Sequence, residues 1–161
     1  MEWSPRKAWL LMTVSWAAVV FNLSRTSYSS AASGRAITTI LGWLSISILP
    51  PNLGLLNALL RKSAHVMEYA IFAALLYNMM KPVEDPSWSR KAAFWALLAS
   101  GSYSLTDEFH QLFVPGRHAS LFDCLIDTMG ALLGLLVLST VLVALRPKPA
   151  GIVAETANGL S

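Results

Sequence analysis

Ionisable side chains gather at three places in an otherwise apolar chain of 161 residues. The gathered side chains are cationic, carboxylic, imidazole, amide or phenolic, and they are Arg61, Lys62, His65, Glu68, Tyr69, Asp107, Glu108, Gln111, Arg117, Asp123 and Asp127. Imidazole and carboxyl groups are the usual general acids and bases, and guanidinium groups bind carboxylates and phosphates. These residue types are therefore the candidate residues of a binding or catalytic site.

The spacing of these residues predicts that they share helix faces. Residues three or four positions apart lie on one face of an α-helix. The rule pairs residues within each group, namely His65 with Glu68 or Tyr69, Asp107 with His110 or Gln111, and Asp123 with Asp127. Three helices would each direct a polar stripe toward a common outer-face cleft. The alternative is an ion-pair network that only fixes the helices relative to one another.

His65, Asp107 and Glu108 are the candidate catalytic residues. An intramembrane enzyme would use His65 or Glu108 as general base and Arg117 to stabilise an oxyanion, as in acyl or phosphoryl transfer. The sequence contains no G-x-S-x-G elbow, Walker loop or HExxH zinc signature, so enzyme status stays open. Imidazole and carboxylate groups suit several divalent ions, but the spacing matches no ligand signature, and we assign neither metal nor cofactor.

Composition indicates an integral membrane protein. The chain is 55% hydrophobic and 13% charged, with a mean hydropathy of +0.52, whereas soluble domains carry about 25% charged residues. Charge inside a membrane costs roughly 2.5–3.5 kcal/mol per residue on insertion scales, so the three groups should lie at a membrane boundary. The net charge of +3 comes from scattered basic residues, which excludes a nucleic-acid interface. A single cysteine, Cys124, excludes an internal disulfide.

Apolar runs predict an all-α bundle of four transmembrane helices, at about residues 8–24, 64–80, 92–110 and 121–145. A cleavable signal peptide is the alternative for the first. Residues 36–60 are uncharged but interrupted by Pro50-Pro51, which predicts an interfacial or re-entrant helix in the first outer loop. Tyr69 and the tryptophans are read most simply as interfacial anchors.

The distribution of basic residues predicts the topology. Four spans with cytoplasmic termini place seven Lys and Arg residues inside and five outside, whereas a fifth span through residues 36–60 reverses the count. The polar groups then share the outer face of one domain, residues 1–145, and residues 146–161 form a short cytoplasmic tail. Since the polar groups crowd one end of the helices, a continuous ion pathway is not expected.

Two glycine-containing segments carry further predictions. Gly130 and Gly134 form a small-xxx-small face, which we interpret as a helix-packing surface. Pro115-Gly116-Arg117 predicts a tight turn that places a guanidinium at the outer surface. That guanidinium would bind an anion, or pair with Asp123 or Asp107.

These motifs resemble those of the VanZ-like membrane proteins, a family named for a protein associated with teicoplanin resistance. The matching residues are Ser24, Lys62, His65, Tyr69, Asp107, Glu108, Gln111, Pro115, Gly116, Arg117, Ser120, Asp123 and Gly130. The chain departs from the family pattern at Asp127, where asparagine is usual, and in lacking a proline after Ser24. The resemblance implies a small multi-span cell-envelope protein and no particular chemical mechanism.

Two functions follow as expectations. In the first, the outer-face cleft binds or modifies an envelope component and lowers susceptibility to teicoplanin-type glycopeptides, with Arg61, Lys62 and Arg117 contacting an anionic or amphiphilic ligand. Its partners would be membrane lipids and an amphiphilic glycopeptide or cell-wall precursor, with no nucleic acid. In the second, the chain is an intramembrane enzyme acting on an envelope lipid. The oligomeric state stays open, although the small-residue face of residues 130–134 permits a dimer.

Overall fold

The computed structural model describes residues 4–23, 30–45, 50–82, 87–113 and 119–145. All secondary structure in these ranges is helical, which confirms the all-α prediction. The helices in chain order are α1 (Pro5–Leu23), α2 (Ser30–Trp43), α3 (Pro50–Met80), α4 (Arg90–Gln111) and α5 (Leu121–Ala144).

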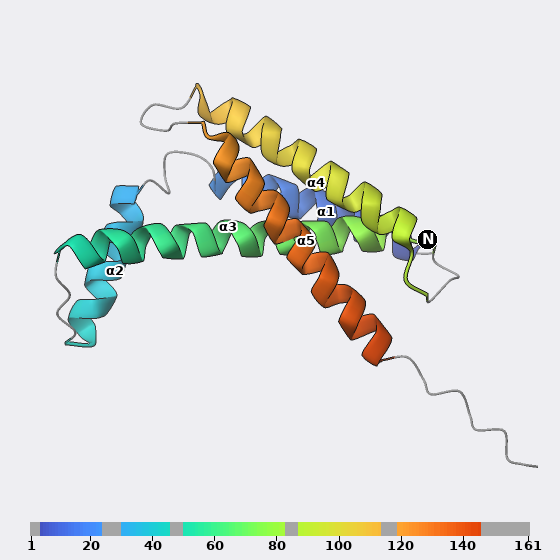
Figure 1. Ribbon diagram of the computed structural model, residues 1–161, viewed down its shortest axis with the longest axis horizontal. Helices are drawn as coiled ribbons and strands as arrows, with labels where there is room; N and C mark the ends of the chain where they lie inside the picture. Colours follow the sequence, from blue (N-terminus) through green and yellow to red (C-terminus); the bar gives the residue numbers. More distant parts are fainter. Residues whose placement is uncertain (1–3, 24–29, 46–49, 83–86, 114–118, 146–161) are drawn as a thin grey trace, which may run out of the picture.

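Helix α3 is the centre of the fold and contacts each of the other four helices. Figure 1 shows α1 and α4 along its C-terminal half, α5 crossing it obliquely and α2 lying across its N-terminal end. Its 31 residues span about 46 Å at 1.5 Å per residue, more than the roughly 30 Å hydrocarbon core of a bilayer.

The segment predicted as one interfacial helix, residues 36–60, is divided between α2 and the first turns of α3. Helix α2 ends at Trp43, and Ser45 has φ 55°, a left-handed conformation common just after a helix. The pair Pro50-Pro51 begins α3. The N–H groups of a first helical turn have no intrahelical partner, so proline is tolerated there. The prolines therefore separate two helices, and the helix predicted from residue 64 begins at Pro50.

Helices α3 and α5 pack almost backbone to backbone. A Cβ added at Gly130 would lie 2.6 Å from the carbonyl oxygen of Val66, and one added at Gly134 would lie 2.6 Å from the Cα of Ala70. Side chains larger than hydrogen do not fit at either position. This confirms the packing interpretation of the two glycines and identifies α3 of the same chain as the helix that they face.

Buried aromatic and small side chains hold the other contacts around α3. Tyr69 and Tyr77 are fully buried on α3, opposite Ala96 of α4 and Ala131 of α5. Interfacial anchoring is therefore the wrong interpretation of Tyr69, since it lies inside the bundle. Helix α1 is attached by Trp16, whose Nε1 donates to the carbonyl oxygen of Glu68 at 3.0 Å.

Among the described helices, only α5 is long and apolar enough by length and composition to cross a membrane. Most of its residues are not buried within the chain, and large apolar side chains such as Leu125, Met129 and Leu133 are exposed. The core helix of a soluble protein would bury this surface. Helix α5 therefore indicates, by itself weakly, a membrane protein.

Candidate functional site

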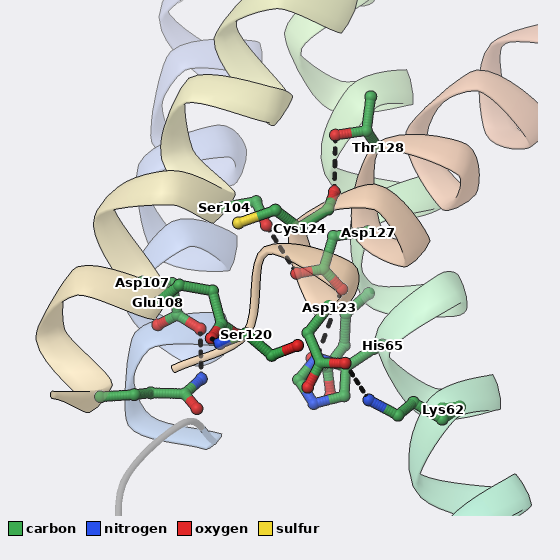
Figure 2. A network of polar contacts seen from close by, with 12 residues as sticks. Lys62, His65, Ser104, Asp107, Glu108, Ser120, Asp123, Cys124, Asp127 and Thr128 are labelled. Carbon is green, nitrogen blue, oxygen red and sulfur yellow. Dashed lines mark hydrogen bonds and ion pairs between the residues drawn. The ribbon is translucent and has the colours of Figure 1, made fainter. Parts of the chain in front are cut away.

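Three helices, α3, α4 and α5, bring the predicted polar residues together in one region (Figure 2). We call the following set the polar cluster: Lys62, His65, Glu68, Ser104, Asp107, Glu108, Gln111, Ser120, Asp123 and Asp127. It contains every Asp and Glu that lies within the described ranges. The carboxyl groups of this part of the chain are thus concentrated at one site.

Asp127 is the most deeply placed carboxyl group of the polar cluster, with 1% of its surface exposed. One carboxylate oxygen accepts a hydrogen bond from Ser104 Oγ at 2.7 Å, and the other lies 3.5 Å from His65 Nδ1. The same Nδ1 is 3.9 Å from the Glu68 carboxylate. One edge of the imidazole therefore faces two carboxyl groups, an arrangement that orients the ring.

The carboxyl groups at the end of α4 are held by neighbouring donors. Gln111 Nε2 donates to Asp107 at 3.2 Å, and both residues are buried. Glu108 accepts a hydrogen bond at 2.7 Å from the backbone N–H of Ser120, the N-cap residue of α5. The Ser120 side chain makes no capping hydrogen bond, so Glu108 supplies negative charge at the N-terminus of α5 in its place. Helices α4 and α5 are thereby joined at their polar ends.

An ion pair between Lys62 and Asp123 joins α3 to the first turn of α5. Both side chains are partly exposed, 42% for Lys62 and 30% for Asp123, so solvent screens their attraction. Next to this pair lies a cavity of about 210 Å³. Its lining is polar apart from one alanine and consists of Ala58, Arg61, Lys62, His65, Gln111 and Asp123. The imidazole of His65 thus borders this polar pocket.

One predicted residue of α4 lies apart from the polar cluster. His110, expected beside Asp107, instead packs its ring on Phe21 of α1, with centroids 4.7 Å apart. Arg117 and the predicted turn around it lie outside the described residues, as does Ser24. Within the described part of the chain, no group of three or more His, Cys, Asp or Glu side chains is arranged to hold a metal ion.

Two serines of α4 were not predicted as site residues. Ser100 and Ser104 are fully buried, and Ser104 is the hydrogen-bond donor to Asp127. Their signal in the sequence is a polar stripe along α4 at helical spacing, in which Ser100, Ser104, Asp107, Glu108 and Gln111 follow one another at intervals of one, three or four residues. A serine on an apolar helix can be an ordinary packing residue. Whether its hydroxyl group belongs to a site depends on which side chain of the neighbouring helix it contacts.

Comparison with known proteins gives one match. A family model described as VanZ/LLP1 matches residues 9–143, which contain α2, α3 and α4 completely and all of α1 and α5 except their outermost ends. Neither the curated proteins nor the solved structures that were compared give a match. The matched range includes every residue of the polar cluster. Since the match extends over most of the sequence, the chain belongs to the VanZ/LLP1 family.

Proposed function

We propose that this protein is a multi-span protein of the cell membrane, with the polar cluster at its outer face and both termini in the cytoplasm. Family membership and the exposed apolar surface of α5 support the membrane location. Exposed apolar side chains also occur on α1, α3 and α4, for example Leu11, Leu59 and Phe94. The excess length of α3 would carry its N-terminal turns and α2 to the outer interface.

The polar pocket is the proposed binding site for an amphiphilic envelope component. Its lining supports this proposal, because two cationic side chains, an imidazole and an amide converge on a volume of about 210 Å³. Lys62 pairs with Asp123 at the pocket, and we assign Arg61, which lines the same pocket, as an anion contact among the described residues. Arg117 would add a second guanidinium. Such convergent polar groups orient a ligand whose remaining surface is apolar.

Drug susceptibility tests the proposed binding function. Cells that lack the gene are expected to become more susceptible to teicoplanin-type glycopeptides, and the intact gene is expected to restore the minimal inhibitory concentration. Arg61→Ala and Arg117→Ala should fail to restore it, because the anion contact is lost. The matched control is Arg35→Ala, which removes an exposed arginine of α2 outside the pocket. Equal susceptibility with and without the gene, across glycopeptides and other wall-directed drugs, would refute the proposal.

The geometry around His65 favours a second candidate function, general acid–base catalysis on an envelope lipid. One edge of the ring faces Asp127 and Glu68, and the ring also lines the polar pocket. A base oriented by carboxyl groups and adjacent to a pocket meets the geometric requirement for proton transfer. The other candidate catalytic residues, Asp107 and Glu108, already accept hydrogen bonds from Gln111 and Ser120. We therefore assign His65 the role of base in this reaction, an acyl or phosphoryl transfer.

Lipid extracts distinguish catalysis from binding. If the protein is an enzyme, an extract from expressing cells should contain a modified lipid that is absent when His65→Ala replaces the intact protein. His110→Ala is the matched control, because His110 lies on α4 against Phe21 and should leave the modified lipid unchanged. Identical lipid profiles for the intact protein and His65→Ala, with both proteins present in the membrane at equal amounts, would exclude this second candidate.

A further inference from the structure

A groove of about 610 Å³ lies between α4 and α5 and takes no part in the polar cluster. It extends along α4 from Phe94 to Leu105 and along α5 from Leu121 to Thr128. Its size falls within the roughly 300–1,000 Å³ that is common for ligand sites. The groove is therefore large enough to hold a ligand beside the pocket already described.

The chemistry of the groove selects a hydrocarbon occupant. No charged residue lines it, and its walls are mainly leucine side chains. Thr128, one of its few polar residues, donates its hydroxyl hydrogen to the carbonyl oxygen of Cys124 at 2.7 Å. A Cβ added to Gly101 would lie 3.4 Å from Thr128 Oγ1, an ordinary contact distance, so α4 and α5 meet at this part of the lining. An occupant with polar groups along its length would find almost no partners.

The outer end of the groove lies beside the polar cluster. Leu121 directly follows Ser120, whose backbone N–H is bound by Glu108. Cys124 lines the groove, and its side chain points toward Ser104, the donor to Asp127 (Figure 2). The polar and apolar sites thus meet at the first turns of α5. An amphiphile with its head group at the outer face would direct its chain along this groove.

The length of the groove matches one leaflet of a bilayer. The stretch from Phe94 to Leu105 rises about 16 Å along α4 at 1.5 Å per residue. Half of the roughly 30 Å hydrocarbon core is about 15 Å. We propose that the groove binds the acyl chain of the same anionic amphiphile whose head group occupies the polar pocket. This inference rests on the proposed binding function and assigns the ligand a long hydrocarbon chain.

Photocrosslinking tests the inference on the full chain in phosphatidylcholine nanodiscs. The probe is dodecyl phosphate with a diazirine at the chain end, and mass spectrometry of peptides locates the labelled residues. We expect labels concentrated on residues 94–105 and 121–128. Ser102→Phe should remove most of them by filling the groove, since Ser102 is an exposed lining residue. The matched control is Thr106→Phe, at an exposed hydroxyl residue of α4 outside the lining, which should retain them.

The outcomes separate this inference from the function on which it rests. If the number of groove labels decreases in both Ser102→Phe and Arg61→Ala, the acyl-chain site and the proposed head-group binding are both supported. Labels that fall in Arg61→Ala but spread over the exposed faces of other helices overturn the groove assignment and leave head-group binding standing. Groove labels that are insensitive to Arg61→Ala identify an ordinary bilayer lipid and overturn the shared-ligand inference together with the assigned anion contact. Absence of groove labels in the intact protein overturns the acyl-chain site.

Discussion

Gly134→Val is expected to force α5 away from α3 and to destabilise the native fold strongly. The added Cβ would lie 2.6 Å from the Cα of Ala70, and a backbone atom cannot move aside as a side chain does. Overpacking typically costs about 1–3 kcal/mol, and this position should reach or exceed the upper value because both helices must shift. The free energy of unfolding in mixed detergent–SDS micelles measures the effect, with helical content followed by circular dichroism.

Gly54→Val is the matched control for this substitution. Gly54 lies in α3, and an added Cβ would meet nothing within 4 Å. Its unfolding free energy should stay within about 0.5 kcal/mol of the intact protein, as is usual for surface substitutions. If Gly134→Val and Gly54→Val unfold at the same SDS fraction, the close approach of α3 and α5 is not a determinant of stability.

Asp127→Leu is expected to produce the second large loss of stability. It removes the acceptor of the fully buried Ser104 hydroxyl and one of the two carboxyl groups that face His65. Leaving a buried donor unsatisfied costs about 1–3 kcal/mol. Asp127→Asn keeps an acceptor oxygen for Ser104 and should cost less. Unfolding free energies of the two variants provide the comparison.

A double variant checks the physical reason for this loss. Replacing both partners of a buried hydrogen bond is less costly than stranding one. Adding Ser104→Ala to Asp127→Leu should therefore recover part of the lost stability, although Ser104→Ala alone removes a hydrogen bond. A strictly additive double variant, or equal losses for Asp127→Asn and Asp127→Leu, would show that the Ser104–Asp127 hydrogen bond does not determine the effect.

The apolar runs predicted the helices of the second half of the chain closely. The predicted spans 92–110 and 121–145 agree with α4 and α5 to within two residues at each end. The start of α3 was missed, because a Pro-Pro pair interrupts a helix in its interior but is tolerated in its first turn. Whether the prolines interrupt a helix or begin one depends on where the helix starts. Sequence patterns locate helix ends less reliably than helix interiors.

The helical spacing rule predicted contacts within one helix better than contacts between helices. The pairing of His65 with Glu68 and of Asp107 with Gln111 is confirmed. The contact of Ser104 with Asp127 depends on how α4 packs against α5, and no spacing rule contains that information. The same holds for His110, which turns toward Phe21 of α1. The role of Arg117 stays a prediction.

The unbroken length of α3 has a mechanical consequence. Helix α2 contacts α3 near one end of α3 (Figure 1). Lys62 and His65 lie near the middle of the same helix, residues 50–80. A continuous hydrogen-bonded helix bends little over about 46 Å. Gly130 and Gly134 of α5 lie directly against the backbone of α3. A displacement of α2 would therefore tilt α3 about this contact. The wall of the polar pocket that α3 provides would move with it, so the position of α2 and the shape of the pocket would be coupled through one stiff helix.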